Sequence, residues 1–227
     1  MTTVEQTEFE YTGPEGDGAT RWLGEPPGGS RGQNRTSADA AVWWRDGDGS
    51  RRITLVEWKY TERQFGTCGG FASRGNDQKA TCIQWRREDF DAHRDCYLER
   101  GDTSRNQRRY WEHLVEAGIL LDSYRGQACP FMGPLYQLMR LHLLAVYVGL
   151  VEPRAKTDVA VVYFEGNHSL LAAPPELHGL DRDMGLAWRR LLCNPESFRT
   201  CSAEGLAAGI REVDSALYAY LRERYGV

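Results

Sequence analysis

The chain has 227 residues, of which 41% are apolar and 26% are charged, a composition typical of globular proteins with a sizeable core. The formal net charge of -4 excludes a broad basic surface, so any polyanion would have to be held locally. No basic segment followed by an apolar run opens the chain, and no apolar run is long enough to cross a membrane. We therefore expect a cytoplasmic protein that does not bind membranes.

A β-hairpin is predicted in the first third of the chain. Residues 12–37 are rich in glycine and proline and predict an irregular segment, with a short helical turn at 19–24. Two apolar runs follow, SADAAVWW (37–44) and ITLVEWKYTE (53–62), and Asp-Gly-Asp-Gly lies between them. This turn signal predicts that the two runs pair as antiparallel strands.

The middle of the chain predicts an insertion, a buried helix and a central strand. Residues 62–130 have balanced charge and predict a mostly helical insertion, with helices near 76–99 and 106–121. An apolar helix is expected from Pro134, because proline suits the first turn of a helix. The run KTDVAVVYFEGN (156–167) predicts a strand that ends at a Gly-Asn turn.

Two helices are expected to close the chain, one around 185–192 and one from about 203 to 224 with Ser202 as its N-cap. The sequence therefore predicts a single α/β domain over residues 1–227. Its mixed central sheet is flanked by helices.

The second strand of the hairpin carries two opposite charges on one face. Alternate residues of a strand share a face, so Glu57 and Lys59 are neighbours. If the hairpin turns around Asp48, then Asp39 lies opposite Glu57. Opposed side chains have Cβ atoms about 5 Å apart, which lets both carboxylates bind one divalent ion. A register slip of one residue would move Asp39 to the other face.

This arrangement predicts metal-dependent hydrolysis of a phosphodiester. Asp39, Glu57 and the backbone carbonyl of Trp58 would hold Mg²⁺, for which Mn²⁺ can substitute, and leave positions for water and a phosphate oxygen. Lys59 would orient or deprotonate the attacking water and stabilise the charge that develops on phosphorus. The alternative is a surface Glu-Lys pair, because the tripeptide Glu-x-Lys is common.

These residues resemble the signature of a known superfamily. Asp39, seventeen intervening residues and Glu57-Trp58-Lys59 look like the motif of the PD-(D/E)XK nucleases. Together SADAAVWW, LVEWKYTE, PFMGPLYQLMRLHLLA and EGNHSL resemble a group of bacterial restriction-endonuclease-like proteins. The resemblance implies a restriction-endonuclease-like core and cleavage of DNA in restriction or another defence against foreign DNA. Ala38 stands in the place of the motif's proline, which does not bind metal.

The resemblance also implies supporting residues. Many members of the superfamily use an acidic residue on the first core helix, for which Glu15 is the candidate here, with Glu10 and Asp17 close behind. Some carry a glutamine on the helix after the motif strand, and Gln137 occupies a comparable place. The alternatives are a solvated turn for Glu15 and a hydrogen-bonded packing role for Gln137.

Contacts to nucleic acid are predicted at RNQRRY (105–110). Arg105, Arg108 and Arg109 form the best local basic patch, and Tyr110 next to them could stack on a base. The balanced charge of 62–130 leaves a solvated helical face as the alternative. A homodimer would let two sites cut two strands of DNA. A nucleic-acid-binding or regulatory subunit of a larger defence complex, without turnover of its own, stays open as another function.

The hairpin tip imitates part of a calcium site. Asp46-x-Asp48-x-Ser50 matches the start of an EF-hand loop, but Arg51 stands where that loop requires glycine. Strand-like sequence also flanks the tip instead of helices. We interpret it as a polar hairpin tip.

Six cysteines lie along the chain without a C-x-x-C pair. A chain of this length does not need disulfides, and we interpret the cysteines as reduced thiols. An iron–sulfur cluster, which some members of the nuclease superfamily carry, is a possible role for Cys68, Cys82, Cys96 and Cys129. Their spacing offers no chelating pair, which favours buried thiols.

Overall fold

The computed structural model describes residues 2–14, 16–28, 34–101 and 107–226. A mixed five-stranded sheet lies at its centre, with the strands in the order β1 (Thr3–Tyr11), β2 (Ala38–Arg45), β3 (Arg51–Lys59), β4 (Ala155–Tyr163) and β5 (Phe198–Ser202). The first three strands pair antiparallel, and β4 and β5 continue the sheet parallel to β3. This confirms the predicted α/β fold with a mixed sheet.

The hairpin of β2 and β3 has the predicted register. Ala41 lies opposite Leu55 and Trp43 lies opposite Ile53. These four side chains are buried on one face of the sheet, where they form part of the core. Because side chains alternate between faces, the same register brings Glu57 and Lys59 to that face at the end of β3.

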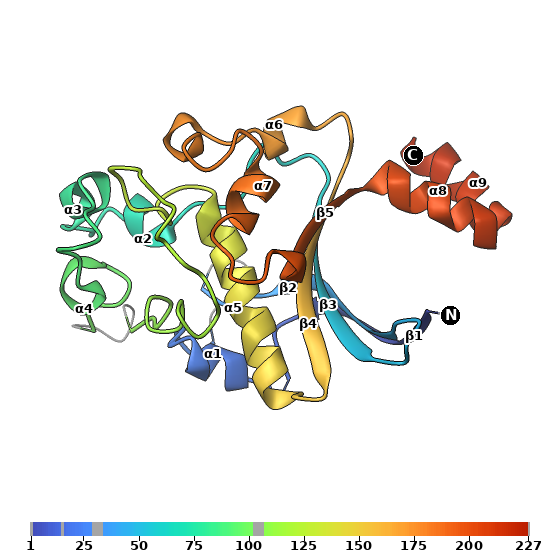
Figure 1. The fold of residues 1–227 in the computed structure, drawn as a ribbon, viewed down its shortest axis with the longest axis horizontal. Coiled ribbons are helices and arrows are strands. Elements are labelled where there is room, and N and C mark those ends of the chain that lie inside the picture. The colour runs from blue at the N-terminus through green and yellow to red at the C-terminus, as the bar shows by residue number, and fades with distance from the viewer. Residues whose placement is uncertain (1, 15, 29–33, 102–106, 227) are drawn as a thin grey trace.

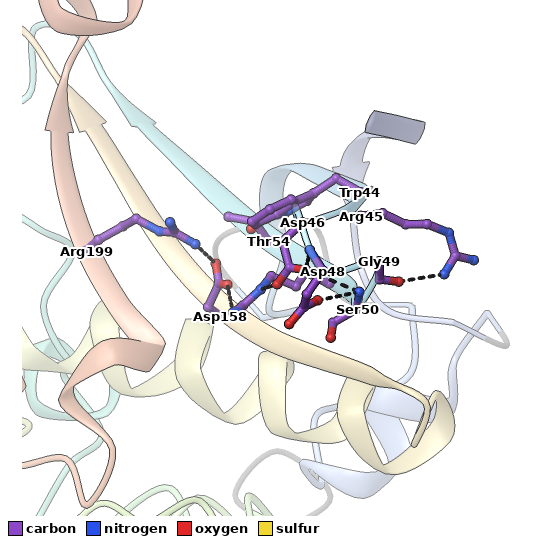
Figure 2. Close-up of polar contacts among 10 residues, drawn as sticks. Trp44, Arg45, Asp46, Asp48, Gly49, Ser50, Thr54, Asp158 and Arg199 are labelled. Carbon is purple, nitrogen blue, oxygen red and sulfur yellow. Dashed lines mark hydrogen bonds and ion pairs between the residues drawn. The ribbon is translucent and has the colours of Figure 1, made fainter. Parts of the chain in front are cut away.

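The tip of the hairpin is closed by its own hydrogen bonds. Asp46 Oδ1 accepts the backbone N–H groups of Asp48 and Ser50, and Asp46 Oδ2 lies 2.8 Å from Arg52 Nε. Figure 2 shows how polar contacts continue from this tip to Asp158 on β4, which pairs with Arg199 on β5 at 2.7 Å. Both carboxylate oxygens of Asp46 are therefore engaged, as expected for a hairpin tip.

A helix covers the face of the sheet that carries the core. This helix, α5 (Leu135–Val151), follows Pro134 as predicted, and side chains on all sides of it are buried. Figure 1 shows α5 between the sheet and the segment that carries α2 (Gly69–Ala72), α3 (Lys79–Ile83) and α4 (Ala92–Asp95). The sheet buries one side of α5 and this segment buries the other, which explains why the helix is apolar on all sides.

The remaining helices are short or lie at the end of the chain. They are α1 (Gly18–Trp22), α6 (His168–Leu171), α7 (Met184–Arg189), α8 (Ala203–Val213) and α9 (Ser215–Tyr225). Ser202 caps α8, since its Oγ accepts the N–H of Gly205 at 3.0 Å. The single helix predicted at 203–224 is interrupted by Asp214, whose carboxylate caps α9 through the N–H of Leu217. None of the helices in the described part of the chain has the length and apolar character that crossing a bilayer requires.

The structure of segment 62–130 differs from the predicted, mostly helical insertion. Its described residues form only three helices of four or five residues each, and the helices expected at 76–99 and 106–121 are not formed. Instead, aromatic side chains pack against one another, with ring centroids 4.5 Å apart for Phe90 and Trp111 and 6.2 Å apart for Trp85 and Trp111. Tertiary packing of large rings outweighs the weak helical preference of a charge-balanced sequence.

Candidate active site

The side chains predicted to carry chemistry meet where β2 begins and β3 ends. Glu57 and Lys59 are buried, with 6% and 7% of their surface exposed, and Lys59 Nζ lies 2.9 Å from Glu57 Oε1. Ala40 on β2 pairs with Val56 on β3, so the next residues along the two strands, Asp39 and Glu57, lie beside each other. The exposed carboxylate of Asp39 accepts the backbone N–H of Trp58 at 2.6 Å. The structure therefore brings Asp39, Glu57 and Lys59 together.

Gln137 reaches the same place from α5. Its Nε2 donates to Glu57 Oε1 at 2.5 Å, and its Oε1 accepts the backbone N–H of Gly66 at 2.7 Å. The side-chain amide thus fixes the orientation of the Glu57 carboxylate against both the helix and the loop after β3.

The charge on Glu57 is disfavoured by its surroundings. Burial raises the pKa of the Glu57 carboxyl group, and Asp39 adds to this effect by repulsion, although Lys59 opposes it by attraction. Two adjacent carboxylates are relieved of this repulsion when a cation binds between them. The electrostatics at the end of β3 therefore favour a bound cation.

A polar pocket of about 430 Å³ opens beside Lys59. Its size lies in the usual range of ligand-binding pockets. Side chains from β3, α5 and the adjoining loops line it, among them Thr36, Ser37, Lys59, Gln64, Gln137 and Arg140. The cations of Lys59 and Arg140 and the amides of the two glutamines suit an anionic group such as a phosphate, while Glu62, which also lines the pocket, lies 3.7 Å from Lys59 Nζ and offsets part of this positive charge.

A buried ionic cluster that we did not predict supports this pocket. Glu25 Oε1 accepts the hydroxyl of Tyr110 at 2.8 Å and lies 3.4 Å from Arg140 Nη2. Thr36 donates its N–H and its hydroxyl to the two oxygens of Glu25, and Arg140 Nε donates to the Thr36 hydroxyl at 2.9 Å. Glu25 therefore holds Arg140 in the wall of the pocket. It lies among glycines and prolines, where no periodic pattern marks it as buried.

Two of the three predicted acids lie in the described part of the chain. Glu10 is exposed on β1, between Phe9 and Tyr11, which pair with Ala40 and Ala38 on either side of Asp39, so Glu10 adjoins Asp39 in the sheet. Asp17 is exposed and pairs with Arg35 at 3.2 Å. Glu15 lies outside the described residues.

The predicted basic patch does not form as one surface in the described part of the chain. Arg108 is buried, with 6% of its surface exposed, and its guanidinium lies 3.4 Å from Asn34 Oδ1. Arg109 is exposed but pairs with Glu112 at 2.6 Å. Arg105 lies outside the described residues. The prediction for Arg108 is corrected, because the chain turns this side chain inward.

The donor set at the end of β3 fits a hard divalent cation. Asp39 and Glu57 supply carboxylate oxygens, and the backbone carbonyl of Trp58 follows directly after Glu57 in the chain. Among the described residues, no three His, Cys, Asp or Glu side chains are grouped to hold a metal ion. The other coordination positions would therefore fall to water and phosphate oxygens, which Mg²⁺ commonly retains.

The fold and this strand-end cluster define an α/β protein with a restriction-endonuclease-like core. A family model described as "REase-ARP: Restriction Endonuclease associating with ARP" matches residues 2–226. The chain belongs to this family, which confirms the resemblance to restriction-endonuclease-like proteins. Comparison with curated proteins and with solved structures gave no match.

Proposed function

We propose that this chain is a Mg²⁺-dependent nuclease that hydrolyses DNA in restriction or another defence against foreign DNA. One observation carries the proposal: Asp39 and Glu57 adjoin, and Lys59 lies 2.9 Å from Glu57 at the edge of a polar pocket. The family's description, which names a restriction endonuclease, supports it. The PD-(D/E)XK motif assigns the same residues to phosphodiester chemistry.

In this proposal each side chain has a distinct task. Asp39, Glu57 and the Trp58 carbonyl would hold a Mg²⁺ ion, which would supply Lewis-acid chemistry at the phosphate. The Lys59 ammonium orients the attacking water and stabilises charge on the phosphate oxygens. Gln137 keeps the Glu57 carboxylate in place, and Arg140 draws the phosphate into the pocket.

The alternative is a nucleic-acid-binding or regulatory subunit of a defence complex without turnover. Two observations favour it. The family's description names an association with ARP. Glu57 Oε1 is also already engaged by Lys59 and Gln137, so this oxygen has its partners without a metal.

Nuclease assays on wild type and Glu57→Ala separate the two functions. Supercoiled plasmid, linear duplex, single-stranded DNA and RNA would each be incubated with Mg²⁺, with Mn²⁺ and with EDTA. We expect the wild type to cleave DNA, and the cleavage to disappear with EDTA and in Glu57→Ala. Cleavage of RNA alone would overturn the assignment of DNA as substrate.

The outcome of a binding assay completes this test. If neither protein cleaves any substrate and both bind DNA equally, the chain is a binding module. If neither protein cleaves or binds nucleic acid and a partner protein co-purifies, the regulatory role is supported and the nuclease proposal fails.

A further inference from the structure

An aromatic groove lies behind the strand end that carries the candidate active site. Its volume is about 460 Å³. Trp58 and Tyr60 at the end of β3 and Phe164 after β4 form one wall, and side chains of α8 and α9 form the other. Figure 1 shows these two helices on the opposite side of the sheet from α5. Because side chains alternate along a strand, the indole of Trp58 points to the face opposite Glu57.

The rings of this aromatic groove form a cluster that stays open to solvent. The ring centroid of Phe164 lies 4.3 Å from that of Tyr60 and 6.5 Å from that of Trp58, and both pairs are edge-to-face. Trp58 and Tyr60 nevertheless expose 43% and 46% of their surface, and Leu206 across the groove exposes 44%. Large apolar side chains that are gathered and exposed mark binding sites more often than parts of a core. The cluster therefore needs a ligand to explain it.

The aromatic groove adjoins the pocket beside Lys59. In residues 59–64, some side chains line that pocket, and the others line a second, open hollow of about 590 Å³. The hollow shares Tyr60 and Phe164 with the aromatic groove. Asn167 Nδ2 donates to the backbone carbonyl of Glu62 at 2.8 Å, which ties the loop after β4 to this segment. A strand of nucleic acid with one phosphate at Lys59 can therefore cross the segment and reach the groove.

The chemistry of the aromatic groove and the hollow suits a nucleotide. Aromatic side chains stack on nucleobases with little regard to sequence, because every base has a flat face. Arg63 lines the hollow, is exposed and makes no ion pair with the residues that the structure describes, so its cation is available to a phosphate. A base inside a duplex is already paired and stacked, and only an unpaired or flipped-out base can enter such a site.

We propose that the aromatic groove of Trp58, Tyr60 and Phe164 binds an unpaired nucleobase of the strand whose phosphate lies at Lys59. The inference rests on the proposed function, since it takes nucleic acid as the ligand. It adds that the substrate is single-stranded, or is opened next to the phosphate that is attacked. The apolar face of a protein partner is the other possible occupant. Continuity with the pocket and the cation of Arg63 favour the nucleobase.

The two occupants differ in what they require of the groove. Stacking on a base requires flat rings, whereas an apolar protein surface also packs on leucine. The test variant is therefore Tyr60→Leu/Phe164→Leu, which keeps apolar side chains and removes the rings. The matched control is Tyr60→Phe/Phe164→Tyr, which keeps both rings. Trp58 is left unchanged because its backbone carbonyl belongs to the proposed metal site.

Binding of a normal and an abasic single strand of DNA tests the proposal. The two strands have equal length and equal numbers of phosphates, and each is titrated by fluorescence anisotropy. Titrations are run with EDTA, and again with Mg²⁺ in proteins that also carry Lys59→Ala, so that no strand is cut. We expect wild type and the matched control to bind the normal strand about 5- to 150-fold more tightly than the abasic strand. The test variant should lose most of this preference.

Two results would overturn the proposal. One is a wild-type protein that binds the two strands equally, or binds neither under both conditions; this readout does not depend on how any variant folds. The other is a test variant that keeps the wild-type preference, which would leave the aromatic groove to an apolar protein partner. Cleavage is measured separately. An active nuclease without base preference refutes the groove alone, whereas base preference without cleavage refutes the nuclease alone.

Discussion

The side-chain amide of Gln137 binds the Glu57 carboxylate, with 2.5 Å between Nε2 and Oε1. The amide oxygen Oε1 of Gln137 accepts the backbone N–H of Gly66 at 2.7 Å. One side chain on α5 therefore joins the end of β3 to the loop that follows it. This connection fixes the carboxylate that is expected to bind the metal.

Replacing Gln137 with alanine should lower nuclease activity without unfolding the protein. Mutation of a residue that orients a metal ligand usually lowers activity or metal affinity about 10- to 100-fold. We expect the Mg²⁺ concentration for half-maximal cleavage to rise in Gln137→Ala. The exposed Gln84→Ala is the matched control and should behave like wild type. Equal Mg²⁺ requirements in all three proteins would contradict the positioning role.

Metal binding at the site should depend on the ionisation of Glu57. Burial raises the pKa of this group, and only its ionised form binds a cation well, so metal affinity should rise with pH through that raised pKa. Mn²⁺ titrations over a pH series measure the midpoint. In Lys59→Met the midpoint should move to higher pH, because Lys59 favours the charged carboxylate. A midpoint that falls in this variant would argue against Glu57 as the ligand.

Breaking the buried cluster behind the pocket should be costly. Arg140→Met leaves Glu25 buried without its cation, which typically costs about 3 to 5 kcal/mol. The free energy of unfolding in urea measures this loss. Adding Glu25→Gln should restore part of it, because the uncompensated charge is then removed. A loss below about 1 kcal/mol for Arg140→Met would mean that the ion pair contributes little to stability.

The buried imidazole of His142 should make the stability of the fold depend on pH. Burial lowers the pKa of this imidazole to about 4, well below its value of about 6.5 in unfolded chains. The unfolded state therefore binds the proton first, and stability falls as pH drops from about 6.5 towards 4. The loss approaches about 3 kcal/mol at the lower end.

Urea unfolding of wild type and His142→Gln between pH 4.5 and pH 8 checks this effect, with the exposed His168→Gln as control. The difference in stability between wild type and His142→Gln should shrink as the pH falls, because only wild type has to protonate this site. A constant difference would show that His142 does not titrate in the folded state as stated.

The hairpin and its register could be predicted because they follow from local chemistry. Asp-Gly-Asp-Gly marks the turn, and the alternation around Glu57 and Lys59 fixes which side chains share a face. Strand β1 could not be predicted in the same way. All of its residues before Tyr11 that the structure describes are exposed, so no apolar alternation marks it. At its end Glu10 has a φ of 53°, which turns Tyr11 inward against Trp43.

Long-range contacts explain what the sequence did not reveal about the sites. Glu25 becomes important only because Thr36, Tyr110 and Arg140 close around it. The four cysteines of segment 62–130 are free thiols that line one small cavity, and only the folded chain brings them together. Gln137 was predicted from a resemblance, and the structure gives it a specific hydrogen-bond partner in Glu57.

Cleavage of supercoiled plasmid by wild type and Lys59→Ala, with Mg²⁺ or with EDTA, tests the central claim most directly. Lys156→Ala is the matched control, because that lysine is exposed at the start of β4, away from the carboxylates. The account predicts EDTA-sensitive cleavage by wild type and Lys156→Ala, and at least a hundredfold slower cleavage by Lys59→Ala. Equal cleavage by all three proteins would contradict the assignment of the active site to the end of β3.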